Sequence, residues 1–332
     1  MTEAYLGWAA SAWHGIWQDN HWVQIDSPPL IHPASASVQF GQNVIEGMKA
    51  HLNPTDGIVR AFRLHDHWKR LVDSCNKLKL PIIPESLFRD ALGSILLHKS
   101  QWEQPLSSNT MYIRPIVYSL DDHIFPKHGK RFGLSIYVAP VGNFLVKNNY
   151  TLRIQDQIGR TADNGLGSTK TASNYAPIFA AQYQQYNVHN LLWLTADIEP
   201  VIDEANTSNI FFITKQNWLI TPSLNDRILP GITRKSIIQL AQEFKIIIEE
   251  KSIELQNLRE NLCAGDIVGC FLTSTGCGIQ PVHTLSYKQQ TWILTNHPLM
   301  AKLEQAYINC FYGSSEIFRE WAELLGSIEE TK

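Results

Sequence analysis

The chain has 332 residues, of which 44% are hydrophobic and 18% are charged. At roughly 150 residues per domain this length predicts about two domains, and the apolar share excludes a disordered chain. The formal net charge of -3 gives no electrostatic basis for a nucleic acid or an anionic membrane as partner. No stretch reaches the roughly 18 apolar residues that a membrane-spanning helix needs.

The cysteines and the first residues of the chain indicate a cytoplasmic protein. The cysteines are odd in number and widely spaced, without a CxxC pair, which argues against a zinc site and for thiols in a reducing compartment. Residues 1–17 contain Glu3 but no Lys or Arg. They lack the basic start of a secretory signal, so we expect them to be part of the fold. The cysteines are Cys75, Cys263, Cys270, Cys277 and Cys310.

Short strand and helix patterns alternate in the first half of the chain. Apolar side chains recur at helical spacing over residues 65–78 and again over 86–97, after a break between two prolines. Runs rich in Ile, Val and Tyr predict strands at 59–63, 111–118 and 132–138. We expect this half to be a small α/β domain, residues 1–139.

A stretch with Pro, Gly and three Asn follows, and residues 140–149 are predicted to be an interdomain loop. The larger second domain is predicted to run over residues 150–332. Its pattern predicts strands at 150–154, 190–194 and 264–273, and a hairpin of 209–213 with 218–221. It predicts helices at 174–185, after Gly231, and at 301–324, the last with a break at 313–315. The mixture indicates an α/β protein with layers around sheets, and not a doubly wound sheet.

Familiar nucleotide motifs are missing from this pattern. No GxGxxG follows a strand and no GxxxxGK[ST] is present, which argues against nicotinamide and ATP chemistry. Four other segments could carry chemistry. The first is Lys170, a lone lysine between small residues, and the second is a polar cluster around Glu204. The third is a helix start at Gly231 with Thr233 in its N-cap region, and the fourth is a turn of small and hydroxylated residues at 273–278. Taken singly, each is better explained as an ordinary surface loop or capped helix.

Taken together and in order, these segments resemble the class IV (fold-type IV) pyridoxal-phosphate aminotransferases, and among them the branched-chain amino acid aminotransferases. The resemblance runs from about His32 to Trp321. It rests on the following segments: His32-Pro33-Ala34, Ile45-Glu46-Gly47-Met48-Lys49, Phe62-Arg63 with Lys69-Arg70-Leu71, Tyr112-Ile113-Arg114-Pro115, Lys170 with Asn174-Tyr175, Glu204 with Asn209, Leu229 to Arg234, Thr273 to Gly278, and Pro281-Val282.

The resemblance implies a two-domain enzyme with its active site at the domain and dimer interface and pyridoxal 5'-phosphate as cofactor. Lys170 matches the family lysine that holds the cofactor as an internal aldimine and then shuttles a proton. Glu204 matches the acid on the pyridine nitrogen, and Tyr175 the phenol on the ring O3′. Arg70 matches the arginine on the phosphate. The remaining cofactor contacts implied are Thr207, Ile232, Thr233, Ser274 and Thr275.

On the substrate side, Arg114 with Tyr112 matches the family's carboxylate-recognition pair, with Thr275 and Gly276 on the α-carboxylate. The implied reaction is transamination between an apolar, branched-chain or related L-amino acid and 2-oxoglutarate, in a cytoplasmic homodimer. Three pocket positions depart from the family pattern, since Phe40 and Phe144 replace tyrosines and Ile45 replaces a phenylalanine.

Three alternatives stay open. The altered pocket positions suggest a modified or non-standard apolar amino acid as substrate, because a buried polar group that lacks its partner weakens binding. A D-amino acid aminotransferase or an aminodeoxychorismate lyase would share the fold. A silent, cofactor-binding paralogue would keep Lys170 without catalysing transamination.

Overall fold

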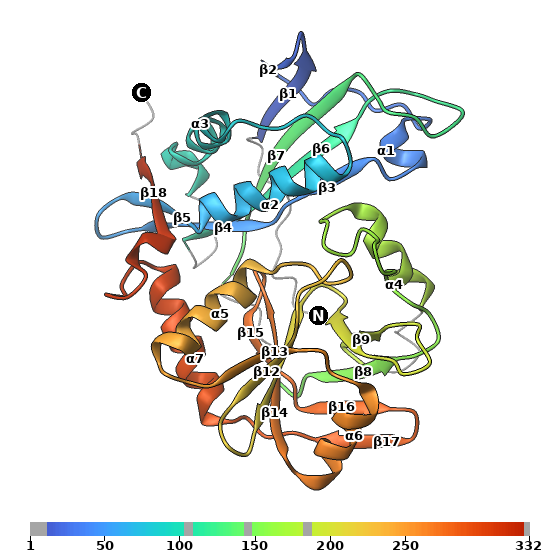
Figure 1. Cartoon of the computed structure of the whole chain (residues 1–332). Coiled ribbons are helices and arrows are strands. Elements are labelled where there is room, and N and C mark those ends of the chain that lie inside the picture. The colour runs from blue at the N-terminus through green and yellow to red at the C-terminus, as the bar shows by residue number, and fades with distance from the viewer. Residues whose placement is uncertain (1–11, 103–108, 143–147, 182–187, 329–332) are drawn as a thin grey trace. The chain divides into compact units, whose positions relative to one another are not determined.

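The computed structural model describes residues 12–102, 109–142, 148–181 and 188–328 (Figure 1). The chain divides into two compact units. Unit 1 contains residues 1–143, 169–173 and 310–332, and unit 2 contains residues 144–168 and 174–309. Each unit has its own sheets and helices, so each is treated by itself.

Unit 1 is built on an eight-stranded sheet in the order β18-β5-β4-β6-β7-β1-β2, with β3 also paired to β6. Its strand pairs are antiparallel, and the longest register joins β6 to β7. The strands are β1 (Ala12–Gln18), β2 (His21–Ile25), β3 (Asn43–Ile45), β4 (Met48–Asn53), β5 (Ile58–Phe62), β6 (Thr110–Ser119), β7 (Phe132–Pro140) and β18 (Ala322–Ser327). The helices are α1 (Ala36–Gln39), α2 (Leu64–Lys77) and α3 (Glu85–Leu96), with 3-10 turns at Lys99–Gln101 and Arg319–Trp321. A further 3-10 turn, Ala172–Tyr175, begins in unit 1, and its last two residues count with unit 2.

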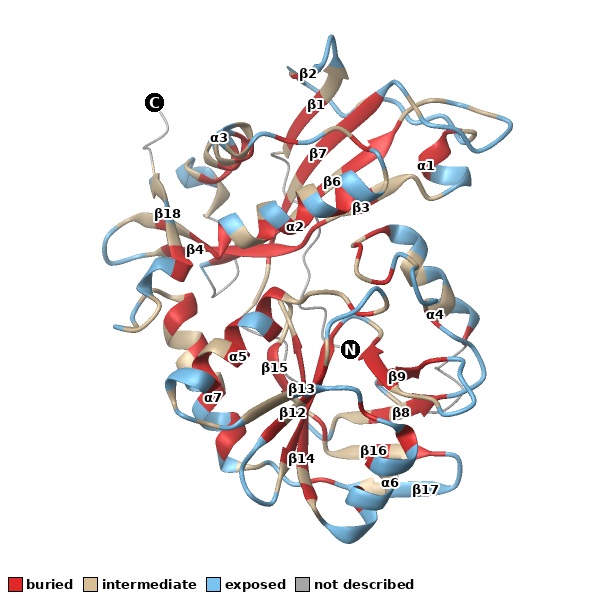
Figure 2. Cartoon of the chain, viewed as in Figure 1, coloured by how far each residue is buried: buried red, intermediate tan, exposed pale blue. Residues whose placement is uncertain are grey.

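The core of unit 1 lies between α2, α3 and one face of this sheet. Leu64, Leu71 and Cys75 on α2 are fully buried, as are Phe88 and Leu92 on α3. Their 3.6-residue spacing lines up one apolar stripe per helix, so packing on the sheet stabilises both helices. Figure 2 shows this pattern, with buried residues on one side of α2 and exposed residues on the other.

Unit 2 contains two five-stranded sheets, β10-β9-β8-β16-β17 and β13-β12-β11-β14-β15. Strand β8 pairs in parallel with both β9 and β16, whereas β11 forms antiparallel pairs with β12 and β14. The strands are β8 (Thr151–Gln155), β9 (Asn190–Leu194), β10 (Ile202–Ala205), β11 (Asn209–Thr214), β12 (Leu219–Pro222), β13 (Ile248–Lys251), β14 (Ile267–Ser274), β15 (Gly278–Pro281), β16 (Thr284–Tyr287) and β17 (Gln290–Ile293). The helices are α4 (Ala176–Ala180), α5 (Ile232–Glu243), α6 (Leu255–Ala264) and α7 (Pro298–Phe311), whose last two residues count with unit 1.

The predicted mixed α/β class is confirmed, and the predicted helices 65–78 and 86–97 match α2 and α3 to within a residue or two. The 209–213 and 218–221 hairpin is also confirmed, as β11 and β12. Only 176–180 of the predicted helix 174–185 is α-helical, and residues 182–187 lie outside the described part of the chain. Half of the predicted interdomain loop 140–149, namely residues 143–147, is likewise outside it.

Two predictions for the C-terminal half are confirmed in part and corrected in part. The strand expected at 264–273 begins only at Ile267, because α6 runs through Ala264 and ends at Gly265, which has a positive φ that favours glycine. The helix expected over 301–324 stops at Phe311, and residues 322–327 form β18, paired with β5. Residues 322–327 therefore belong to the sheet of unit 1 and not to the predicted second domain. Among the described residues, no helix is long and apolar enough to span a membrane.

Candidate active site

Lys170 is held through its backbone by two segments of unit 1. Its N–H donates to Ser74 Oγ on α2 at 3.1 Å, and its carbonyl accepts the N–H of Ile45, at the end of β3, at 2.9 Å. An isolated bridge between Val44 and Thr171 continues this contact. The side chain of Lys170 is half-buried. A lysine with a fixed backbone and a long, mobile side chain suits a residue that must bind and release a ligand with its amine.

Arg70 lies one turn before Ser74 on α2 and is paired with a carboxylate that is completely buried. Its Nε donates to Glu46 Oε2 at 2.9 Å and its Nη2 to Glu46 Oε1 at 2.5 Å. Burial alone would raise the pKa of the Glu46 carboxyl. The charge of Arg70 and hydrogen bonds from His67 and Arg70 outweigh burial and hold this pKa well below its ordinary value.

Tyr112 and Arg114, the predicted carboxylate pair, are brought together on β6. They are two residues apart in a strand, so their side chains leave the same face of the sheet. Arg114 Nη2 donates to the Tyr112 hydroxyl at 2.6 Å, and the guanidinium lies 5.2 Å from the ring centroid. A Cβ on Gly47 would clash with that hydroxyl. Within the described chain, Arg114 Nε is buried without a hydrogen-bond partner, as expected for a group that binds a ligand.

The surroundings of the other predicted substrate residues are defined by fewer contacts. Phe40 follows α1 and is 39% exposed. Ile45 is half-buried beside Lys170, through the backbone bond described above. Phe144 lies outside the described residues.

In unit 2, Glu204 lies at the end of β10 and is 5% exposed. Its Oε1 is 2.7 Å from Arg160 Nη2 and accepts the N–H of Leu229 at 3.2 Å. Its Oε2 accepts from Asn209 Nδ2 at 2.8 Å, and the same Asn209 amide donates to the carbonyl of Leu229 at 2.9 Å. Three donors from three segments therefore fix this carboxylate in one orientation.

The start of α5 is tied to Glu204 through Leu229 and Asn209, since Leu229 lies two residues before Gly231. The structure corrects the predicted N-cap: it is Gly231, not Thr233, and no side chain caps the helix. A Cβ at Gly231 would clash with Asn209 Oδ1, which requires glycine here. Thr233 and Ile232 are buried in the first turn, and Thr233 Oγ1 is 3.4 Å from the Tyr307 hydroxyl.

The remaining predicted contacts lie in loops of unit 2. The hydroxyl of Ser274 is 3.0 Å from Cys277 Sγ and accepts the Cys277 N–H at 3.3 Å, which closes the turn that holds Thr275 and Gly276. Thr275, Gly276 and Tyr175 are half-buried, and Thr207 is exposed in the turn between β10 and β11.

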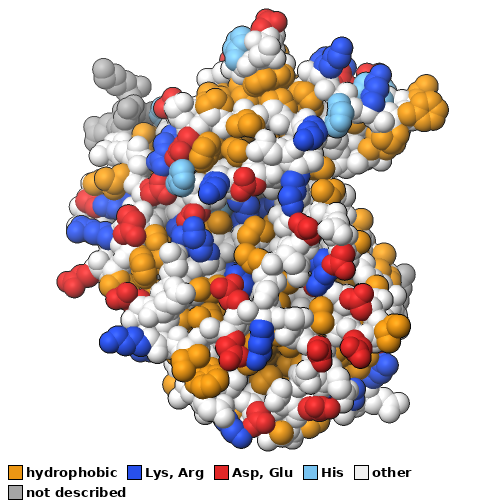
Figure 3. Space-filling view, in the orientation of Figure 1, with side chains coloured by type: hydrophobic (Ala, Val, Ile, Leu, Met, Phe, Trp, Pro, Cys, Tyr) orange, Lys and Arg blue, Asp and Glu red, His pale blue; other side chains and the backbone are white. Residues whose placement is uncertain are grey.

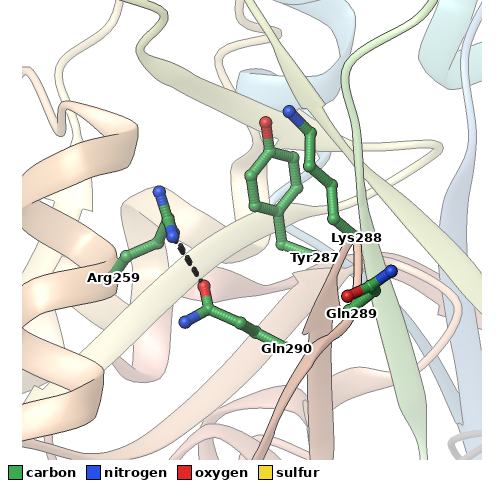
Figure 4. A pocket seen from close by; sticks show the side chains of 5 residues that line it. All are labelled: Arg259, Tyr287, Lys288, Gln289 and Gln290. Atoms are coloured by element: carbon green, nitrogen blue, oxygen red, sulfur yellow. Dashed lines mark hydrogen bonds between the residues drawn. The ribbon is translucent and has the colours of Figure 1, made fainter.

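Three side chains that hold the site in place are not predicted from the sequence, namely Arg160, Glu46 and Ser74. A buried carboxylate such as Glu204 needs a partner, and this requirement is the signal by which Arg160 could be sought. Glu46 lies in a matched motif that assigns it no role, and Ser74 is one polar residue on an amphipathic helix. A surface pocket of about 380 Å³, lined by Arg259, Tyr287 and residues 288–290, contains none of the predicted site residues (Figure 4).

The comparisons with known proteins identify the family of this chain. A family model for class IV aminotransferases matches residues 43–285. A probable branched-chain-amino-acid aminotransferase of Staphylococcus aureus (strain N315) is 31% identical over 304 residues, which cover 89% of this chain and 84% of that protein. Branched-chain-amino-acid transaminase 1 of Bacillus subtilis (strain 168) is 29% identical over 273 residues, covering 81% and 76%.

Solved structures confirm the predicted fold. The branched-chain aminotransferase of Thermoproteus uzoniensis with norvaline has a TM-score of 0.75 at 24% identity, covering 94% of this chain and 99% of that one. The enzyme of Thermobaculum terrenum in its PLP-form (holo-form) has a TM-score of 0.75 at 21% identity, covering 94% and 98%. The chain therefore belongs to the class IV aminotransferases, and its similarity within that family is to the branched-chain aminotransferases.

Proposed function

We propose that the protein catalyses pyridoxal-phosphate-dependent transamination between an apolar, branched-chain or related L-amino acid and 2-oxoglutarate. The observation that carries this proposal is the buried Glu204 carboxylate of unit 2, which Arg160 and Asn209 hold in place. Within unit 1, the backbone of Lys170 is likewise fixed, by Ser74 and Ile45. The relatives named as branched-chain aminotransferases support the same activity.

The donor set in unit 2 fits pyridoxal phosphate. Helix α5 starts without a side-chain cap, so its first N–H groups can bind a phosphate. The buried Thr273 Oγ1, opposite Asn209 in the β11–β14 pair, has no hydrogen-bond partner among the described residues. An orphaned buried hydroxyl is expected where a ligand completes the bonding. The fixed Glu204 carboxylate fits a protonated pyridine nitrogen.

When bound, the cofactor supplies an electron-withdrawing ring that weakens the bond between the substrate Cα and its hydrogen. We propose that Lys170 would hold the cofactor through its amine. Once the substrate amine has displaced it, the freed lysine amine would accept the Cα proton. Glu204 would hold a proton on the ring nitrogen, and Tyr175 would donate to the ring oxygen. The groups that would bind the phosphate are Arg70, the α5 start at Ile232 and Thr233, and the turn at Ser274 and Thr275.

Arg114 and Tyr112 bind a substrate carboxylate in this proposal. Phe40, at a position where the family has tyrosine, is partly exposed and offers an apolar surface without a hydroxyl. This favours a second candidate within the same reaction, namely transamination of a bulkier or modified apolar amino acid. A cytoplasmic location stays a prediction of the sequence.

A panel of amino donors with 2-oxoglutarate tests the substrate. We expect leucine, isoleucine and valine, or a bulkier apolar amino acid, to give the highest kcat/KM, with the L-enantiomer preferred. The readout is the glutamate formed, with its configuration determined by chiral chromatography. Turnover of D-amino acids alone, or pyruvate release from aminodeoxychorismate, would assign the chain to the other branches of the fold. No turnover with bound cofactor would indicate the silent paralogue.

We further propose that the active form is a homodimer. Unit 1 exposes an apolar surface formed by Leu30, Val38, Ile124 and Phe125. The two segments that carry it are joined by the backbone bond from Ala36 N to Asp121 O at 2.8 Å and by a bridge between Ser35 and Asp122. Figure 3 shows hydrophobic side chains gathered at the upper right, where α1 and the loop after β6 lie in Figure 1. Exposed apolar clusters of this kind mark interaction surfaces.

Replacing Ile124 and Phe125 together by glutamate is expected to convert the dimer to a monomer, because two charges on each subunit would then be buried in the interface. Sedimentation velocity measures the change, and the exposed Ile198→Glu in unit 2 is the control. If wild type sediments as a monomer, the dimer proposal is wrong. If the double variant stays dimeric, this surface is not the interface.

A further inference from the structure

We propose that Glu46 is a positioning residue, which sets the guanidinium of Arg70 in the orientation that binds the cofactor phosphate. The proposal rests on the proposed function, since it assigns Arg70 to the phosphate. It concerns how this chain presents Arg70, and it gives Glu46 a role in cofactor affinity that is separate from its role in the core.

The carboxylate of Glu46 accepts four hydrogen bonds, all from unit 1. Two come from Nε and Nη2 of Arg70, at 2.9 and 2.5 Å. The N–H of Gly47 donates to Oε1 at 2.8 Å, and His67 Nδ1 lies 3.0 Å from the same oxygen. Two parallel bonds between a carboxylate and a guanidinium fix the plane of both groups, which a single bond would not.

Burial makes this arrangement rigid. Glu46 is 0% exposed, His67 2% and Arg70 7%. A buried arginine side chain that is bonded through two of its nitrogens loses its rotamer freedom before any ligand arrives. Binding energy then need not be used to order it. Burial also lowers the pKa of His67, so its imidazole adds a hydrogen bond without a full second positive charge near neutral pH.

The same short segment also places Lys170. The Ile45 N–H holds the Lys170 carbonyl, and the next residue, Glu46, holds Arg70. On α2, Arg70 and Ser74 lie four residues apart on one face, and Ser74 holds the Lys170 N–H. The end of β3 and one face of α2 therefore fix both residues of unit 1 that the proposed function assigns to the cofactor, the lysine and the arginine.

Glu46→Gln tests this inference, because glutamine keeps the shape and one acceptor but removes the charge. Apo-protein is titrated with pyridoxal phosphate and, separately, with pyridoxal, which lacks the phosphate, and binding is followed by absorbance. We expect the affinity for pyridoxal phosphate to fall by about 10-fold to 100-fold, as for the loss of one charge-assisted contact. The affinity for pyridoxal should change by less than about threefold, the scatter expected for a site left untouched.

The matched control is Glu85→Gln. Glu85 is bonded to His65 and Arg89 in the same unit, as Glu46 is to His67 and Arg70, but its side chain is 29% exposed. It should leave both affinities unchanged. A second measurement guards against misfolding: in an Arg70→Met background, adding Glu46→Gln should no longer change the affinity for pyridoxal phosphate, since the group through which it acts is gone.

Equal losses for pyridoxal phosphate and pyridoxal, or an undiminished effect of Glu46→Gln in the Arg70→Met background, would show a general structural role and overturn the inference. Unchanged affinity in the single variant would overturn it as well. Wild-type protein that binds no pyridoxal phosphate would instead overturn the proposed function. The two failures are therefore distinguishable in one set of titrations.

Discussion

Lys170→Ala is expected to lose transamination by at least about 10²–10⁴-fold, the contribution that a positioned proton-transfer group makes. The expectation follows from the two roles of this amine, which attaches the cofactor and moves the proton at the substrate Cα. The variant should still fold, because Lys170 is held through its backbone N–H and carbonyl, and both remain in alanine. Its protein should bind pyridoxal phosphate only reversibly, without a covalent link.

Borohydride reduction followed by peptide mass analysis measures that link. In wild type the added mass of the cofactor should lie on the peptide that contains Lys170, and in the variant it should be absent. Lys215→Ala is the control, since Lys215 is an exposed lysine paired with Asp266 in unit 2. Added methylamine should restore part of the activity of Lys170→Ala if the missing amine is what limits the rate. Full activity without it, or a label on another lysine, would refute the assignment.

The site illustrates how far local sequence can predict chemistry. Lys170, Glu204 and Gly231 stand in short motifs whose residue types suit their chemistry, so the sequence alone could nominate them. What holds them could not be nominated. The residue that accepts the Lys170 N–H, Ser74, is 96 residues away. It belongs to an amphipathic pattern in which one hydroxyl carries no special signal.

The same reason explains the errors in the fold. Helices α2 and α3 follow from their own periodicity, which is a local property. Strand β18 has little periodicity of its own and is defined by its pairing with β5, more than 250 residues earlier, as in the pair of Ala322 with Phe62. A short terminal segment with Gly326 in its middle gives no pattern by which such a partner could be found, because strand pairing is set by tertiary contacts.

Glu204→Gln is expected to lower kcat by about 10²–10³-fold, as does the removal of one fixed electrostatic group from other active sites. The amide keeps the shape of the carboxylate and can still accept the hydrogen bond from Leu229. It cannot hold a positive charge on the ring nitrogen, so the ring would withdraw electrons less strongly. Since substrate does not contact Glu204 in the proposed function, KM should change much less than kcat.

The replacement also tests the energy of the Arg160 pair. Both side chains are about 5% exposed, and breaking a buried pair from one side typically destabilises a protein by about 3–5 kcal/mol. The glutamine oxygen can still accept a hydrogen bond from Arg160. We therefore expect the free energy of unfolding, measured in urea, to fall less for Glu204→Gln than for Arg160→Met, which leaves the Glu204 charge without its arginine.

The control is Glu250→Gln, because Glu250 pairs with Arg234 in the same unit but has a side chain that is 43% exposed. A kcat for Glu204→Gln equal to that of this control would remove Glu204 from the mechanism. Together the two measurements separate its role in catalysis from its role in the fold: kcat should follow the charge at Glu204, and stability should follow the pairing of Arg160.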